Sequence, residues 1–166
     1  MRLKAHSFAA GFSLVESMLA IAISALFLGS VFALNISSMG AIRCAKESVS
    51  AGQVLQQRIE SLRIANWQQI TTASWIKANI LNTDALGTEP LKNLSETLTL
   101  VPYGSTSLGN TKLTRSGGTT TIVTTTPLLT ENAIKVIWTL DYTGAPNSSA
   151  VSRQIVAILA KGGVAK

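Results

Sequence analysis

The feature that most constrains this chain is an apolar run from Phe12 to Leu34 that contains a single acidic residue, Glu16. No charged residue occurs between Glu16 and Arg43. As an α-helix rising about 1.5 Å per residue, the run is long enough to cross the ~30 Å hydrocarbon core of a bilayer. A carboxylate in such a helix costs roughly 2.5–3.5 kcal/mol at its centre and less near an end. Glu16 is therefore a candidate functional residue that requires a partner.

A short basic segment precedes this run. Residues 1–11 include Arg2 and Lys4 and end at Gly11. If the chain were cut after Gly11, the new ammonium group of Phe12 would be the natural partner for Glu16. The order of basic leader, glycine, phenylalanine, Ser-Leu-Val-Glu and apolar helix resembles the prepilin signal of type IV pilins and type II secretion pseudopilins. The resemblance covers residues 1–34.

The resemblance implies a specific processing route. Prepilin peptidase, a membrane aspartic protease, would cut after Gly11 and N-methylate Phe12. The chain would then be a single-pass inner-membrane protein with its head domain in the periplasm or outside the cell. It would act as a structural subunit, not an enzyme: a minor pilin, pilin or pseudopilin of a type IV pilus or type II secretion pseudopilus. Glu16 would pair with the Phe12 amine, of a neighbour or of its own chain, when the apolar helices bundle.

The partners implied by the resemblance are prepilin peptidase, other pilin or pseudopilin subunits, an assembly platform membrane protein, and membrane lipid before assembly. The apolar helix contains Gly29 but no proline between Phe12 and Gly40. Major pilins often have both residues there, so the absence of proline favours a minor pilin or a pseudopilin. The sequence does not decide between a pilus and a secretion pseudopilus.

Three other interpretations stay open. An ordinary secretory signal peptide would be cut near Val31-Phe32-Ala33, but its apolar region is usually only ~7–15 residues long. A plain single-span anchor is the second, and in both cases Glu16 has no purpose. The third, from another functional class, is a membrane-anchored envelope domain that binds a ligand and never polymerises. That domain would not be cut after Gly11.

Composition and charge exclude several functions. The 166 residues carry a formal net charge of +6, and loss of Arg2 and Lys4 with the leader gives 6 − 2 = +4. There is no dense Lys/Arg cluster, so the charge pattern argues against nucleic-acid binding. The only histidine is His6, in the leader, and the only cysteine is Cys44, which we expect to be a small packed residue. The sequence therefore predicts no catalytic site, no metal site and no cofactor.

The chain beyond the leader divides into an apolar helix at 12–34, an amphipathic helix at 35–66 and a head domain at 67–166. In the amphipathic part, apolar or small residues recur every three or four positions and predict the packed face: Ile42, Ala45, Val49, Gly52, Leu55, Ile59 and Leu62. Charged residues are expected off that face: Arg43, Lys46, Glu47, Arg58, Glu60 and Arg63.

The head begins with a connecting region, 67–96, which we expect Trp67 and Trp75 to anchor and which includes a helical turn near 72–81 capped by Thr71 or Thr72. Alternating and β-branched residues then predict four strands, at 97–101, 119–126, 133–140 and 153–160, with Gly117 and Gly118 in a turn. The predicted fold class is α+β: a long N-terminal helix whose amphipathic half packs on a C-terminal antiparallel sheet, the lollipop shape of pilins.

Overall fold

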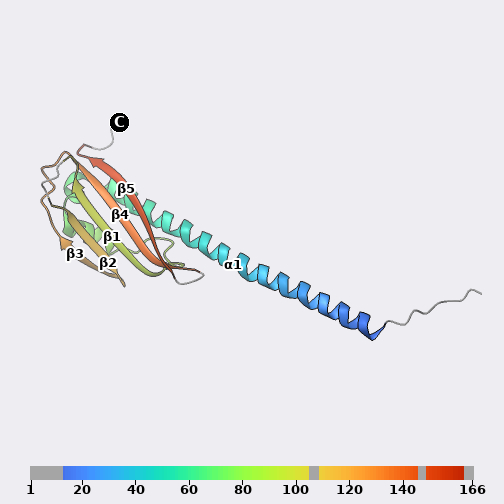
Figure 1. Cartoon of the computed structure of the whole chain (residues 1–166). Helices are drawn as coiled ribbons and strands as arrows, with labels where there is room; N and C mark the ends of the chain where they lie inside the picture. Colours follow the sequence, from blue (N-terminus) through green and yellow to red (C-terminus); the bar gives the residue numbers. More distant parts are fainter. Residues whose placement is uncertain (1–12, 105–108, 146–148, 163–166) are drawn as a thin grey trace, which may run out of the picture. The chain divides into compact units, whose positions relative to one another are not determined.

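A computed structural model describes residues 13–104, 109–145 and 149–162. The chain divides into two compact units, Met1–Gly40 and Ala41–Lys166. Helix α1 (Leu14–Ile64) contributes to both units, its first part to one and its second part to the other (Figure 1). The predicted α+β class is confirmed, because the long N-terminal helix is packed on a five-stranded antiparallel sheet.

The sheet has the strand order β3-β2-β1-β4-β5 and every neighbouring pair is antiparallel. Figure 1 shows the five strands side by side. Their bounds are β1 Lys92–Pro102, β2 Thr111–Ser116, β3 Thr119–Thr124, β4 Ala133–Gly144 and β5 Ser149–Ala160. The prediction of four strands was one short. Strand β2 was missed because its lysine and arginine hide the alternation, in which Thr111 and Leu113 face inward.

The turn between β2 and β3 follows from its two glycines. Gly117 and Gly118 both have positive φ, +56° and +78°. A two-residue hairpin loop with both φ positive is the type I′ turn, which matches the right-handed twist of the flanking strands and which glycine adopts without strain. The predicted turn at this position is confirmed.

The second part of α1 and one face of the sheet enclose the core. Leu98 and Leu100 of β1 and Val136 and Trp138 of β4 point inward and are fully buried. They alternate with half-buried or exposed residues, as a sheet with one covered face requires. Trp67 and Trp75 pack partly buried against this core, as predicted.

The buried face of α1 differs from the predicted one. Leu55, Ile59 and Leu62 are buried as expected, but Ile42, Ala45, Val49 and Gly52 are exposed. Packing against the sheet begins about two turns later and on a rotated face, and the full set of buried residues is Ser50, Ala51, Val54, Leu55, Arg58, Ile59 and Leu62. Cys44 is also exposed, so its prediction as a packed residue was wrong.

Short helices connect α1 to the sheet: α2 (Trp67–Ile70), α3 (Ala73–Ile76) and η1 (Lys77–Leu81). Asn66 caps α2 through a capping box, in which its side chain accepts from the Gln69 N–H and the Gln69 side chain accepts from the Asn66 N–H. The helical turn predicted near 72–81 is confirmed, with Thr72 at the N-cap position of α3. The Thr72 side chain makes no cap bond; its hydroxyl donates to the Gln68 carbonyl instead.

Candidate functional site

The first candidate site is the start of α1. The predicted cleavage and methylation residues, Gly11 and Phe12, lie outside the described residues, so both assignments stay predictions. Glu16 is described: it lies in the first turn of α1, is exposed, and its N–H donates to the Ser13 hydroxyl at 3.2 Å. Ser13 thus caps the helix, and Glu16 is the third residue after the cap.

This geometry gives Glu16 a local role that sequence reasoning missed. A serine followed three residues later by glutamate is the sequence order of a capping box. An acid in the first turn of a helix also interacts favourably with the partial positive charge of the helix N terminus, typically by 0.3–1 kcal/mol. The order Ser-Leu-Val-Glu at residues 13–16 was the sequence signal for this local role of Glu16. Among the described residues Glu16 forms no ion pair, so its predicted partner remains the Phe12 amine.

The first part of α1 is apolar and uncovered. An 18-residue window has a mean hydropathy of 2.2, and none of its residues is buried. Large side chains such as Leu26, Phe27 and Phe32 are each more than 60% exposed. The helix is long and apolar enough to cross a membrane. Without a covering environment such a surface would be a strong aggregation liability in water.

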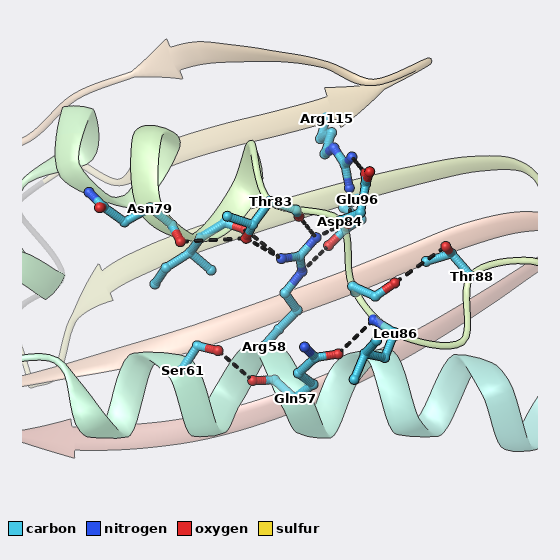
Figure 2. Close-up of polar contacts among 12 residues, drawn as sticks. Gln57, Arg58, Ser61, Asn79, Thr83, Asp84, Leu86, Thr88, Glu96 and Arg115 are labelled. Carbon is cyan, nitrogen blue, oxygen red and sulfur yellow. Dashed lines mark hydrogen bonds and ion pairs between the residues drawn. The ribbon is translucent and has the colours of Figure 1, made fainter.

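The second candidate site is a charged network inside the head (Figure 2). Arg58 reaches from α1 to Glu96 on β1: its Nε and Nη2 donate to Oε2 and Oε1, each at 2.9 Å. The Arg58 side chain is only 3% exposed and that of Glu96 only 1%. Arg58 also donates to the backbone carbonyls of Ile80 and Thr83. Helix, connecting region and sheet therefore meet at one guanidinium group.

This burial corrects the prediction that Arg58 lies off the packed face. Arg58 is four residues after Val54 and four before Leu62, so its spacing places it on the buried stripe. Its charge suggested the opposite, because isolated arginines are seldom buried unless paired. The partner, Glu96, is far away in sequence, and only the fold brings the two together. The guanidinium also lies over the Trp138 ring, 5.9 Å from its centroid.

Arg115 on β2 extends the network. Its Nη1 donates to Glu96 Oε1 at 3.1 Å, and its Nη2 donates to Asp84 in the connecting region. Burial by itself lowers the pKa of Arg115, but the bonds to Asp84 and Glu96 outweigh it, so the pKa is raised above its ordinary value. The guanidinium is thus firmly charged. Two arginines and two carboxylates leave the network with no net charge.

A cavity of about 470 Å³ opens beside this network and includes Asp84, Asn93, Arg115 and the Gly117–Gly118 turn in its lining. Its charged groups are already paired with one another: Arg115 donates to two carboxylates, and Glu96 accepts from two arginines. Arg115 Nε is buried without a hydrogen-bond partner among the described residues. Among the described residues there is no group of three side chains suited to a metal ion. The network therefore joins α1 and the connecting region to the sheet.

A scan against protein-family models, a search of curated proteins and a search of solved structures each gave no significant match.

Proposed function

We propose that this chain is a structural subunit, a minor pilin, pilin or pseudopilin, which is cut after Gly11, methylated at Phe12 and assembled into a type IV pilus or a type II secretion pseudopilus. One observation carries the proposal. A single helix, α1, begins with an uncovered apolar stretch bearing one acid, Glu16, and ends as part of the core of a sheet domain. Such a helix can exchange lipid for neighbouring helices while its second part stays folded in the head.

The assembly mechanism follows from the cost of burying charge. When apolar helices leave lipid and bundle together, an unpaired Glu16 carboxylate or an unpaired Phe12 amine in the bundle would each cost several kcal/mol. Pairing the two neutralises both. Because only a correctly staggered neighbour can bring its amine to Glu16, the pair selects a register between subunits and adds little net stability.

The same proposal gives the location and partners. Before assembly the chain spans the inner membrane once; Arg2 and Lys4 keep the leader in the cytoplasm, as the positive-inside rule favours. The head then lies in the periplasm or outside the cell. Prepilin peptidase reaches the leader from the cytoplasmic side, and a platform membrane protein passes the processed subunit to the filament.

The test is the mature N terminus. The full chain is co-expressed with a prepilin peptidase, and its intact mass and first residue are determined by mass spectrometry. The proposal expects loss of residues 1–11 and a methylated Phe12, and it expects Gly11→Leu to block both. An N terminus at Leu34 would identify a secretory signal peptide instead. An unprocessed wild-type chain would favour the anchored envelope domain that does not polymerise.

A further inference from the structure

Strand β5 lies at one end of the sheet and pairs with β4 on one side only. Among the described residues, its other side pairs with no strand. It is twelve residues long and pairs with β4 along its whole length without a bulge. An edge strand of this kind offers a row of free backbone donors and acceptors to another extended chain. Natural sheets usually protect such edges with prolines, bulges or inward-pointing charges. From Gln154 to Ala160, β5 has no proline and no charge.

The backbone groups on the free edge can be identified. The Lys161 N–H donates to the Asn132 carbonyl at 2.7 Å, which places Lys161 in a hydrogen-bonded pair facing β4. In an antiparallel ladder, alternate residues direct both their N–H and C=O to the same neighbour. Since the register is continuous, Ala157 and Leu159 face β4, whereas Val156 and Ile158 direct their N–H and C=O to the free edge.

The side chains at this edge are suited to an apolar strand. Val156 and Ile158 are 50% and 54% exposed on the open face of the sheet, although both side chains are large and apolar. Both are also β-branched, the shape that packs well against a neighbouring strand. On the helix-covered side, a cavity of about 300 Å³ lies at the end of β5, with Leu62, Trp67, Ile70 and Leu159 among its lining residues. Its lining comes from residues 62–70 and from the end of β5 with Gly162 just after it, and none comes from β4. An added strand could therefore place alternate side chains against Val156 and Ile158 on one face and into this cavity on the other.

Charge selects the kind of strand that fits. Arg153 and Lys161 directly flank the uncharged run Gln154 to Ala160. If a second copy paired antiparallel so that this run lay opposite itself, Arg153 of each copy would therefore lie opposite Lys161 of the other. Like charges directly opposite each other destabilise a strand pair. β5 carries no acidic residue. A strand with acidic residues at both ends would instead meet Arg153 and Lys161 favourably.

We propose that the free edge of β5 binds an extended segment of a different polypeptide, with β-branched apolar residues in its middle and acidic residues at its ends. The segment adds a sixth strand to the sheet. This site lies in the head and does not depend on how the N terminus is processed.

The experiment uses the full chain in detergent micelles and a fluorescent synthetic peptide as the probe. The peptide matches Gln154 to Ala160 in length, alternates valine with threonine, and has an added aspartate at each end. Saturable binding is measured by fluorescence anisotropy. A peptide with lysine at each end should bind about tenfold more weakly, because two attractive pairs become repulsive. A peptide with aspartate ends and a central proline should also lose about tenfold.

Protein variants test the edge itself. Val156→Pro removes a donor from the free edge and none from the β4 ladder, so it should weaken binding of the aspartate-ended peptide about tenfold with unchanged thermal unfolding. Val156→Thr keeps the donor and the β-branched shape and should bind as the wild type does. If Val156→Pro fails to fold, Ile158→Pro removes the next free donor. Equal binding of the aspartate-ended and lysine-ended peptides, wild-type affinity in the folded proline variant, or a wild-type dimer that this variant dissociates would overturn the proposal.

Discussion

Arg58 of α1 and Glu96 of β1 form a bidentate ion pair in the interior of the head, through two hydrogen bonds of 2.9 Å. The two residues are 38 positions apart in the sequence. Removing two charges from water is costly, and the pair is tolerated because every charged atom has a partner: Glu96 also accepts from Arg115, and Arg58 also donates to backbone carbonyls. The pair fixes which face of α1 meets the sheet.

Breaking this pair on one side should destabilise the head strongly. Glu96→Ala leaves a buried Arg58 without its counter-charge, and we expect a loss of about 3–5 kcal/mol in the free energy of unfolding. Arg58→Met should cost less, because Arg115 still neutralises Glu96. The double variant Arg58→Met with Glu96→Met should recover part of the Glu96→Ala loss. Urea unfolding followed by tryptophan fluorescence, to which Trp67, Trp75 and the buried Trp138 all contribute, measures all three variants. A double variant less stable than Glu96→Ala would contradict this account.

The contribution of Arg115 should be constant around neutral pH. Its pKa in the folded head is raised above the ordinary value, with burial opposing and the bonds to Asp84 and Glu96 favouring the charged form. A raised pKa means that the stabilisation is fully present below the unfolded-state pKa, which itself lies far above neutral pH, and is lost only as the pH rises through the folded-state value. Arg115→Met should therefore lower stability equally at about pH 7 and about pH 9. A deficit that disappeared at the higher pH would contradict this assignment.

The β2–β3 turn should tolerate asparagine but not a β-branched residue. Gly117 has φ of +56°, where a side chain other than asparagine, aspartate or glycine costs roughly 1–2 kcal/mol. Gly117→Asn produces Asn-Gly, the preferred pair for a type I′ turn, and should keep or slightly raise the melting temperature. Gly117→Val should lower it. No atom lies within 4 Å of an added Cβ, so a clash at that atom would not account for a loss in the valine variant.

Removing the first unit should leave a folded head. Residues from Ala41 onward form a compact unit of their own, and the buried face of α1 from Ser50 to Leu62 is covered within that unit. We expect a chain of 41–166 to be soluble and monomeric and to unfold cooperatively, as sedimentation and thermal melting can measure. Aggregation through the helix, or a melt without a cooperative transition, would mean that this face needs other subunits to cover it.

Two variants separate the local and assembly roles of Glu16. Glu16→Gln removes the charge that would neutralise the Phe12 amine, so we expect normal cleavage, a folded head and reduced incorporation into sheared filaments. Ser13→Ala removes the helix cap, at about 1 kcal/mol, but keeps the carboxylate, and it should enter filaments nearly as well as the wild type. The measurement is the ratio of filament to membrane protein by immunoblot. Equal loss in both variants would indicate that Glu16 acts through helix capping alone.

Periodicity predicted most of the fold because it reports which residues must avoid water. The apolar run identified the first part of α1, and alternation with β-branched residues located β1, β3, β4 and β5, although their ends differed by several residues. Strand β2 was missed because an edge-proximal strand with Lys112 and Arg115 has a weak alternation. The Arg115 guanidinium pairs with Asp84 and Glu96 instead of facing solvent. Both partners are distant in sequence, so no local pattern can predict this pairing.

The sequence by itself determined the membrane-length helix, its single acid and the class of the head, because each depends on residues that are neighbours along the chain. The three-dimensional fold decided which face of α1 is buried and where Arg58 meets Glu96. It also decided that β5 is, within the described part of the chain, an unpaired edge beside an apolar cavity. These features depend on pairs of residues far apart in sequence. Their energies arise only when folding brings the partners together and excludes water between them.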